Sequence, residues 1–467
     1  MGSATSVRWV AVLACAIAAS GFVPGAALAQ PPESPEDGLA VPEPLPNGFA
    51  VPQDDGQPDK DYVRETPCIS SLPSAPIEQK PWGQDRLRFR ELATFATGVG
   101  QKVAVIDTGV SDHTYFGGRL EAGGDYVARD GNGLEDCDGH GTAVAGIIAA
   151  DPADEAIGFR GIAPAARIVS IRQTSANYKF TDPETNESQP AGNLPTLTKA
   201  IIRAANTDDV TVINMSVNNC RPASLGPIRD EERQLQAALH YAVAERDIVV
   251  VASAGNIGEG NCTTQNGPDP RNPTQIVLPP WFSDYVLSVA AMTEAGEPAE
   301  FSIQGPWVSV AAPGTDIVSL DPANPDQLVN RTYDKDRKEA PIQGTSFAAP
   351  YVAGLAALVR ERYKDLDARQ VMHRIKATAA HPAATGGRDT LVGHGMIDPI
   401  AALTAFIPAE ENIPPDKAVA VPFDMPPPYE RDWGPIQVAI IGSAGGVGLL
   451  LVTLFVVHTV RRNRRTN

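Results

Sequence analysis

Basic residues are scarce in this chain of 467 residues, which has 38 lysines and arginines against 56 aspartates and glutamates. The formal net charge is −18 at pH 7, and five of the arginines lie in the first 29 and the last seven residues, where there are no acids. Nucleic-acid binding needs a basic surface to meet the phosphates, so this balance argues against a nucleic-acid partner. An acidic chain of this kind stays soluble, and its charge indicates no other function.

Cysteine is also rare, and no two cysteines have the Cys-x-x-Cys spacing that zinc sites commonly use. Of the five, Cys15 lies in a segment that we expect to be removed, which leaves Cys68, Cys137, Cys220 and Cys262. An even number in an exported chain predicts two disulfides, and the residues alone leave all three pairings open. No acidic cluster is specific enough to indicate a calcium site, so we expect no metal and no cofactor.

Acidic residues are absent from residues 1–29, which hold Arg8, an apolar run over 9–19 and an Ala-Leu-Ala triplet at 27–29. A basic start, a short apolar run and a small-residue cleavage site are the build of a secretory signal peptide. An uncleaved anchor is the alternative, and the short apolar run favours cleavage. We therefore expect the mature chain to be exported.

Charge of either sign is absent from residues 436–460. A helix of this length, at about 1.5 Å per residue, spans a hydrocarbon core of about 30 Å with some tilt. Residues 461–467 contain four arginines, and a basic flank belongs on the cytoplasmic side. We expect one transmembrane helix, with the bulk of the chain outside the membrane and a cytoplasmic basic tail; a buried core helix is the alternative.

Two segments are rich in proline and have no sustained hydrophobic period, residues 30–81 and 408–435. Such composition does not bury a core of its own. We interpret the second as a linker before the membrane helix. The first has three interpretations: a removable pro-segment, a plain linker, or an arm lying over the main domain. Cys68 favours the arm, because a disulfide from it to Cys137 would attach the segment to the loop just before His140.

The region between them, residues 82–407, alternates between two patterns. Runs rich in valine and isoleucine predict buried strands at 102–106, 167–171, 210–217, 247–252 and 285–291. Helical patterns lie at 140–150, 195–206, 231–246, 346–362 and 367–380. Apolar strands separated by helices predict an α/β fold with a mostly parallel sheet and helices on both faces. Residues 174–195 are polar, and we interpret them as a long surface loop.

Three polar residues stand at the ends of these elements. Asp107 closes the first strand, and His140 and Ser346 each open a helix rich in alanine and glycine. A carboxylate, an imidazole and a hydroxyl are the groups of a nucleophilic hydrolase. In that chemistry the aspartate orients the histidine, the histidine acts as base and then acid, and the serine attacks. Taken singly, they have simpler interpretations as a turn aspartate, a packed histidine and a helix N-cap.

Other features of the sequence bear on these three residues. We expect Pro350 in the first turn of the helix that begins near Ser346, where its missing N–H costs little. The Asp-Thr-Gly triplet at 107–109 is also a mark of aspartic proteases. No second Asp-Thr-Gly and no Asp-Ser-Gly occurs, and that chemistry needs two carboxylates sharing a proton, so we exclude it.

The order Asp…His…Ser is that of the subtilisin type. Asp-Thr-Gly at 107–109, His-Gly-Thr at 140–142, Ala-Gly-Asn at 254–256 and Gly-Thr-Ser at 344–346 resemble the motifs of subtilisin-like serine proteases, and the resemblance covers residues 82–406. It implies a subtilisin-like fold and the hydrolysis of peptide bonds.

The resemblance also implies roles for further residues. Asn256 would donate its side-chain amide to the tetrahedral oxyanion, together with the N–H of Ser346. Substrate-binding residues would be Ser216, Val217, Ser253 and Gly255. The chain departs from the family at Asn218, where glycine is usual, and at Ala143, where many members have another histidine. The first departure predicts a narrower cleft, and the second lies outside the catalytic groups.

The wider layout is similar to that of the mycosins, the membrane-anchored subtilisin-like proteases of type VII secretion systems. It comprises the signal peptide, the arm with its cysteine, a cysteine beside the histidine motif, the linker, the single helix and the basic tail. This resemblance implies the pairs Cys68–Cys137 and Cys220–Cys262 and an arm that stays on the domain. It also implies association with membrane components of a secretion complex, and the small residues Gly442, Ala444, Gly446 and Gly448 suit packing against another helix, although they also suit lipid contact.

The sequence thus predicts a membrane-anchored serine endopeptidase that acts on protein or peptide substrates outside the cytoplasm. The alternative is that the domain mainly stabilises a membrane secretion complex and that proteolysis is secondary. A degradative subtilase is a third interpretation, and the tether and basic tail argue against it.

Overall fold

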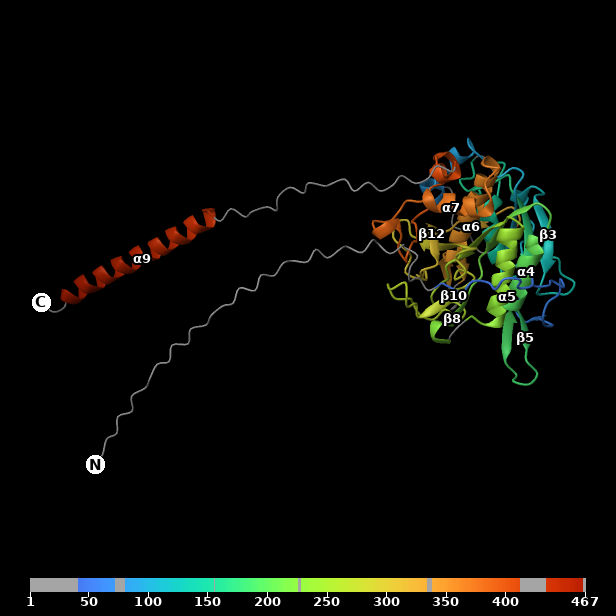
Figure 1. Ribbon diagram of the computed structural model, residues 1–467, viewed down its shortest axis with the longest axis horizontal. Coiled ribbons are helices and arrows are strands. Elements are labelled where there is room, and N and C mark those ends of the chain that lie inside the picture. Colours follow the sequence, from blue (N-terminus) through green and yellow to red (C-terminus); the bar gives the residue numbers. More distant parts are fainter. Residues whose placement is uncertain are drawn as a thin grey trace, which may run out of the picture. The chain divides into compact units, whose positions relative to one another are not determined.

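The computed structural model describes residues 41–71, 80–154, 156–225, 228–333, 338–411 and 434–464 (Figure 1). The predicted signal peptide and most of the predicted linker lie outside these residues. The chain forms two units, residues 1–411 and residues 412–467. The first holds the predicted catalytic residues, and the described part of the second is a long helix.

A parallel sheet forms the centre of the first unit. Within the described residues it has seven strands in the order β12-β11-β9-β7-β2-β4-β3, and every neighbouring pair is parallel. The strands are β2 Lys102–Asp107, β3 Leu120–Asp125, β4 Arg167–Arg172, β7 Val210–Met215, β9 Val249–Ser253, β11 Leu287–Met292 and β12 Val308–Pro313. The five predicted strands are therefore confirmed, and the sequence did not show the two edge strands β3 and β12.

Helices cover this sheet. They are α3 His140–Ala149, α4 Leu194–Ala205, α5 Asp230–His240, which continues as a π-helical turn over Tyr241–Glu245, α6 Thr345–Arg362, α7 Ala368–Ala377 and α8 Pro399–Thr404. Helix α3 packs against α6, and α4 packs against α5, so the helices form two groups around the sheet (Figure 1). The predicted α/β fold, a mostly parallel sheet covered by helices, is confirmed.

Helix α6 lies in the domain core, with every residue from Thr345 to Arg360 buried. Its small residues let the sheet and the neighbouring loop approach closely. At Gly354 an added Cβ would lie 1.9 Å from Cγ2 of Ile162, well inside van der Waals contact. The close approach fixes the position of the helix, and Ser346 lies at its N-terminus.

The interpretation of residues 174–195 as a loop was wrong. They contain β5 Ser175–Thr181 and β6 Ser188–Ala191, which form an antiparallel hairpin, and β1 Val63–Arg64 adds to it as a third strand (Figure 1). The middle of β5 is only half-buried, so no core imposes an apolar period on its sequence. Its partner β1 comes from the arm, more than a hundred positions earlier, where local sequence gives no hint of pairing.

The arm lies on the domain. Acidic arm residues pair with basic residues of α4 and its surroundings: Asp54 Oδ2 is 3.0 Å from Nε of Arg203, and Asp55 Oδ1 is 2.8 Å from Nζ of Lys199. Glu43 makes a third such pair, with Arg233 of α5. These contacts support the interpretation of an arm over that of a plain linker.

Two disulfides are present, Cys68–Cys137 and Cys220–Cys262, and both pairings match the expectation. The first joins the arm to the loop before α3. The second joins β8 Asn219–Pro222, which pairs with β10 Gln275–Leu278, to the loop after β9. Both bonds therefore attach chain segments close in sequence to predicted site residues, since Cys137 precedes His140 and Cys262 follows Asn256.

The remaining short elements lie around the sheet. They are α1 Trp82–Arg86, α2 Phe89–Leu92, β13 Ser319–Leu320, β14 Leu328–Val329, β15 Arg331–Tyr333, β16 Glu339–Pro341 and 3-10 turns at Thr114–Phe116, Ala223–Leu225, Thr385–Gly387 and Pro408–Glu411. Strand β13 pairs with β14, and β15 pairs with β16.

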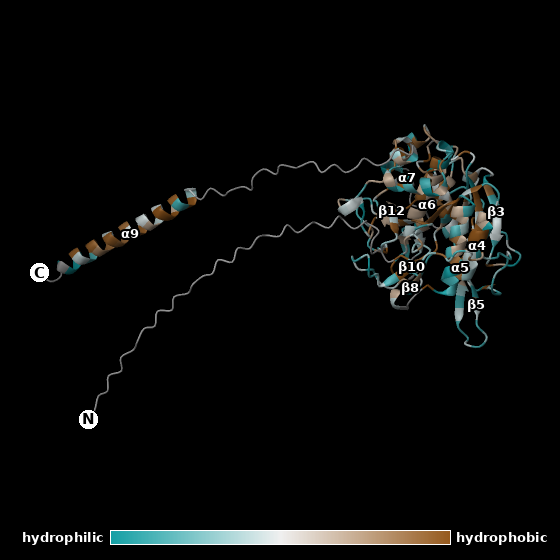
Figure 2. Ribbon diagram, in the orientation of Figure 1, coloured by the Kyte–Doolittle hydropathy of each residue, from teal (hydrophilic) through white to brown (hydrophobic). Residues whose placement is uncertain are grey.

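The second unit contains one described helix, α9 Gly434–Asn463. It is long and apolar enough to cross a membrane, and Figure 2 shows the hydrophobic colour along most of its length. Large apolar side chains such as Leu449 and Phe455 are exposed on it. The predicted apolar stretch 436–460 falls within this helix.

Replacement of Gly354 by alanine tests the close packing of α6. In an open helix alanine is favoured over glycine by about 1 kcal/mol, but here the added methyl meets Ile162. We expect Gly354→Ala to lower the free energy of unfolding by about 1–3 kcal/mol, measured as a lower midpoint in thermal unfolding. Gly267→Ala is the matched control, because a Cβ at that glycine has nothing within 4 Å. An unchanged midpoint for Gly354→Ala would contradict the packing.

Candidate active site

The fold brings the predicted catalytic aspartate and histidine together at the carboxyl edge of the sheet. Asp107 ends β2, His140 begins α3, and Nδ1 of His140 lies 2.7 Å from Oδ1 of Asp107. The same oxygen accepts a hydrogen bond from the main-chain N–H of Thr108 at 2.8 Å. The carboxylate is fully buried, so it acts on the imidazole with little screening by water.

Glycine at position 141 makes this contact possible. A Cβ there would lie 2.0 Å from the carbonyl oxygen of Gly109 and 3.1 Å from Cβ of Asp107. Any larger residue would push the start of α3 away from the end of β2. The glycine beside the histidine is thus a packing requirement of the aspartate–histidine pair.

Asp136 is a buried residue of the site to which the sequence gave no role. Its carboxylate accepts hydrogen bonds from the main-chain N–H groups of Gly139 (2.7 Å) and Thr142 (2.8 Å). It also accepts from the hydroxyls of Thr108 (2.8 Å) and Thr142 (2.6 Å). Burial raises the pKa of this carboxyl despite the four donors. The signal in the sequence was an aspartate four residues before the histidine, at the entry to a helix of small residues.

The electrostatic surroundings make His140 a strong base. Burial by itself disfavours the imidazolium, but the charge of Asp107 and its hydrogen bond outweigh burial, and together with Asp136 and Glu259 they raise the pKa of His140 to about 9. A general base must be neutral to accept a proton. The imidazole therefore gains this ability as the pH rises toward about 9.

Ser346 lies in the first turn of α6, one residue before a side chain that contacts the histidine. The ring of the following residue, Phe347, lies with its centre 5.0 Å from that of His140. The hydroxyl of Ser346 donates to the carbonyl oxygen of Ser216 at 3.2 Å. Catalytic hydrogen bonds are often incomplete without substrate, and rotation of this hydroxyl toward His140 is the step that base catalysis requires.

The expectation that Pro350 lies in the first turn of α6 was wrong. The helix begins at Thr345, so Pro350 is in the second turn, four residues after Ser346. Because proline has no N–H, the carbonyl oxygen of Ser346 has no helical donor. The hydroxyl of Ser216 takes the place of that donor, at 2.7 Å from the oxygen, and itself accepts from Nδ2 of Asn214 at 3.1 Å. The proline thereby allows the end of β7 to hold the start of α6.

The predicted oxyanion donor Asn256 follows β9 and contacts the same helix end. Its Oδ1 accepts from the N–H and from the hydroxyl of Thr345, each at 2.9 Å. Its Nδ2 donates to Oε2 of Glu259 at 2.8 Å. The amide group is thus oriented with its oxygen toward α6 and its nitrogen toward Glu259.

The predicted substrate-binding residues lie on the two strand ends beside this helix. Ser216 and Val217 follow β7, and Ser253 and Gly255 follow or end β9. Asn218 links the two segments: its Nδ2 donates to the carbonyl oxygen of Ser253 at 2.7 Å, and its Oδ1 accepts from the hydroxyl of Ser253 at 2.9 Å. A side chain that bridges the two strand ends is consistent with a narrowed cleft.

The arm lines part of the site. A pocket of about 90 Å³ beside His140 is lined by Ile69 and Ser70 of the arm together with Pro322 and Phe347.

One group of side chains lies close enough together to hold a metal ion: Cys68, Glu135 and Cys137. The two cysteines form a disulfide and therefore offer no thiolate.

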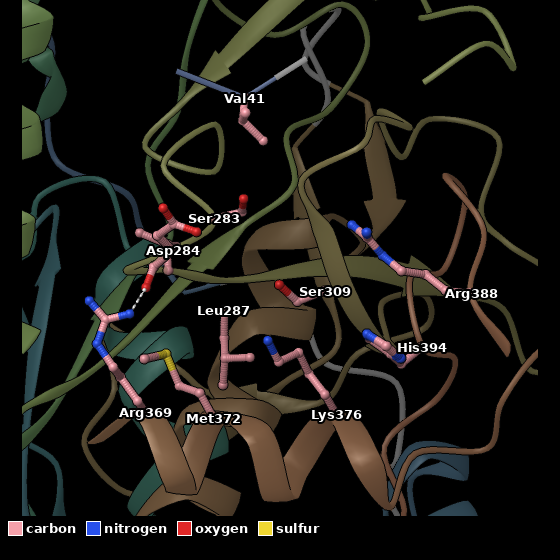
Figure 3. A pocket seen from close by; sticks show the side chains of 11 residues that line it. Val41, Ser283, Asp284, Leu287, Ser309, Arg369, Met372, Lys376, Arg388 and His394 are labelled. Atoms are coloured by element: carbon pink, nitrogen blue, oxygen red, sulfur yellow. Dashed lines mark hydrogen bonds between the residues drawn. The ribbon is translucent and has the colours of Figure 1, made fainter. Parts of the chain in front are cut away.

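A larger cavity, of about 430 Å³, is separate from these residues. Figure 3 shows Met372 and Lys376 pointing into it from α7, with Arg388 and His394 on another wall. Burial and the positive charges of Arg388 and Lys376 lower the pKa of His394 to about 4. The cavity is lined by none of the predicted catalytic residues, and the sequence did not indicate it.

Comparison with known proteins adds to this geometry. Residues 98–395 match the model of the Subtilase family. The chain is 42% identical to Mycosin-1 of Mycobacterium tuberculosis over 446 residues, which cover 91% of this chain and 95% of the relative. It is 40% identical to Mycosin-1 of Mycolicibacterium smegmatis over 423 residues, with 87% and 91% covered.

Solved structures agree with this similarity. The crystal structure of MycP1 from the ESX-1 type VII secretion system matches with a TM-score of 0.70 and 41% identity, covering 80% of this chain and 99% of that one. A chain in the periplasmic assembly from the ESX-5 inner membrane complex matches with a TM-score of 0.73 and 39% identity, covering 84% and 100%.

Removal of the charge of Asp107 tests the origin of the basicity of His140. In Asp107→Asn, burial acts on the imidazole without its main opposing charge, so we expect the pKa to fall from about 9 by about two units or more. Histidine side-chain NMR across a pH titration measures it. Asp138→Asn is the control, because that carboxylate accepts hydrogen bonds from Ser175 and Ala176 and not from His140. A pKa that stays near 9 in Asp107→Asn would show that another group sets it.

Proposed function

Because the chain belongs to the subtilase family and, within it, to the mycosins, we propose that its serine-protease activity is carried by Asp107, His140 and Ser346. The observation that carries this assignment is the 2.7 Å hydrogen bond between His140 and the buried carboxylate of Asp107, with Ser346 on the adjoining helix end. The substrate is a peptide bond in a protein or peptide.

The proposed reaction has two halves. The hydroxyl oxygen of Ser346 attacks the carbonyl carbon, its proton passes to Nε2 of His140, and Asp107 stabilises the imidazolium through Nδ1. The oxyanion takes hydrogen bonds from Nδ2 of Asn256 and from the N–H of Ser346. His140 then protonates the leaving amine, and water hydrolyses the acyl-enzyme by the same route in reverse. The N-terminus of α6 adds a favourable partial charge near the oxyanion.

We propose that substrates enter a cleft that is narrower than a degradative protease needs. The bridge between Asn218 and Ser253 crosses the two strand ends that would pair with the substrate. The arm forms a wall of the pocket at His140, and it is held there by the disulfide at Cys137. These features favour a small set of protein targets.

The location follows from the ends of the chain. We propose that residues 1–29 direct export, that α9 anchors the protein in the membrane, and that the arginines after residue 460 stay in the cytoplasm. The catalytic domain then lies outside the cytoplasm, beside membrane components of a type VII secretion complex. The similarity to a chain of the ESX-5 inner membrane complex supports this placement.

We propose a second function on the similarity to chains of the ESX-5 inner membrane complex. A chain that is similar over most of its length to a component of an inner membrane complex can stabilise such a complex by contact alone. The two functions are compatible, because the proposed catalytic residues and the surfaces of the domain are separate parts of the molecule.

Replacement of the nucleophile tests the catalytic assignment. We expect Ser346→Ala to reduce cleavage of a peptide library by at least about 10³-fold, because alanine lacks the hydroxyl oxygen that forms the ester bond of the acyl-enzyme. The variant should unfold at the temperature of the original chain. Ser188→Ala, at an exposed serine of β6, should cleave normally. Unchanged cleavage by Ser346→Ala would refute the assignment.

The structural function is tested by comparing two strains in their native membrane. Deletion of the whole chain should destroy the secretion complex, because a contact surface is lost, and Ser346→Ala should leave it assembled. Native gel electrophoresis of solubilised membranes measures the complex. Loss of the complex in both strains would mean that assembly depends on the active site, and an intact complex in both would remove the structural function.

A further inference from the structure

The loop after β9 places a carboxylate against the proposed oxyanion donor. Oε2 of Glu259 accepts a hydrogen bond from Nδ2 of Asn256 at 2.8 Å. The assignment of oxygen and nitrogen in this amide is fixed by Thr345, which donates twice to Oδ1. The nitrogen must therefore be the atom that faces Glu259.

The main chain holds this glutamate in place while its side chain stays accessible. A tight turn brings the N–H of Gly258 to the carbonyl oxygen of Cys262 at 2.8 Å, and the N–H of Cys262 to that of Glu259 at 3.0 Å. Gly258 and Gly260 have φ values of +88° and +51°, which favour glycine. The disulfide to Cys220 anchors the turn, whereas the side chain of Glu259 is exposed to solvent.

The carboxylate also acts on the histidine. Three carboxylates raise the pKa of His140: Asp107 from β2, Asp136 from the loop before α3 and Glu259 from the loop after β9. The contribution of Glu259 is smaller than those of the other two. Glu259 is hydrogen-bonded to the oxyanion donor itself, so its main electrostatic effect falls on the oxyanion side of the site.

We propose that Glu259 is an occluding group, whose carboxylate engages the oxyanion donor of the resting enzyme and has to leave before a substrate carbonyl is activated there. The inference rests on the catalytic function proposed above. A carboxylate and a tetrahedral oxyanion carry the same charge, and both seek the amide of Asn256. Even if the second N–H of the amide met the oxyanion, the adjacent negative charge would oppose it.

A purely orienting role for Glu259 is the competing explanation. Asn256 does not need it, because Thr345 already holds the amide through two hydrogen bonds to Oδ1. The two explanations predict opposite signs. Loss of an occluding group raises the rate of acylation, whereas loss of an orienting group lowers it.

The experiment measures the second-order rate at which the full chain reacts with a fluorophosphonate probe. In that reaction a bond forms between Oγ of Ser346 and phosphorus, fluoride leaves, and the serine proton passes to His140. The phosphoryl oxygen requires the oxyanion donor, as a substrate carbonyl does. We expect Glu259→Ala to react about three to ten times faster, since the contact is charge-assisted but exposed to water. Glu259→Gln keeps an acceptor without the charge, so its rate should lie between that of the original chain and that of Glu259→Ala.

Two further measurements separate occlusion from other effects. At a pH above about 9, where His140 is neutral in every variant, Glu259→Ala should bring no gain once Asn256 is replaced by alanine, because the amide that it frees is missing. The acid limb of the pH profile should move to lower pH in Glu259→Ala, because one of the charges that raise the pKa of His140 is gone. Glu294→Ala, at an exposed glutamate in the loop after β11, is the matched control. It should leave the reaction rate and the acid limb of the pH profile unchanged.

The outcomes distinguish this inference from the proposed function. If Ser346→Ala still reacts, or the original chain does not, the catalytic assignment fails and the inference falls with it. If the original chain reacts through Ser346 and Glu259→Ala is equally fast or slower, the inference alone is overturned. A gain in Glu259→Ala that is the same with and without Asn256 also overturns it, because the amide contact would then not be the cause.

Discussion

The hydrogen bond between Asp107 and His140 is the contact on which the arrangement of the site depends. It joins the end of a buried strand to the start of a helix, and it requires that α3 approach β2 more closely than any residue larger than glycine at position 141 would permit. The buried carboxylate of Asp136 reinforces the same junction by binding the donors of the loop that leads into the helix. An imidazole held in this way turns Nδ1 toward the aspartate and leaves Nε2 to serve the proposed nucleophile. Catalytic geometry here is thus a consequence of how strand and helix pack.

A second junction places Ser346, the proposed nucleophile. Pro350 deprives the carbonyl oxygen of Ser346 of its helical donor, and the hydroxyl of Ser216 supplies one from the end of β7. A residue that would weaken most helices therefore links this helix to the sheet. The same helix end receives Asn256 through Thr345, so β7, β9 and α6 converge within one network of hydrogen bonds. Because α6 is also buried along most of its length, the network fixes the main chain at Ser346 and the oxygen end of the amide of Asn256.

The sequence predicted the parts of this protein whose signals are local. Buried parallel strands show as runs of valine and isoleucine, and the residues around Asp107, His140 and Ser346 keep motifs that a known family shares. The resemblance also supplied both disulfide pairings, which spacing alone did not decide. The hairpin at β5 and β6 escaped detection because its partner is a distant arm and no core lies beneath it. The contacts of Asp136 and Glu259 escaped for another reason: their partners Thr142 and Asn256 are near in sequence, but residue type alone does not reveal which side chains will bond. The donor from Ser216 to the helix end lies more than a hundred positions from Ser346.

The charges of the arm give it an uneven hold on the domain. Its first described part is attached mainly by acidic residues that meet the scarce cations of α4 and α5, whereas its last part is joined covalently to the loop before His140. Salt screens exposed ion pairs over about 8–10 Å at ordinary ionic strength and leaves a disulfide untouched. Rising ionic strength therefore weakens the attachment of the first described part of the arm. The part near Cys68, beside the proposed active site, stays attached. A reducing environment breaks that covalent link and leaves the end near His140 held by hydrogen bonds such as the one from Ser71 to Asp321.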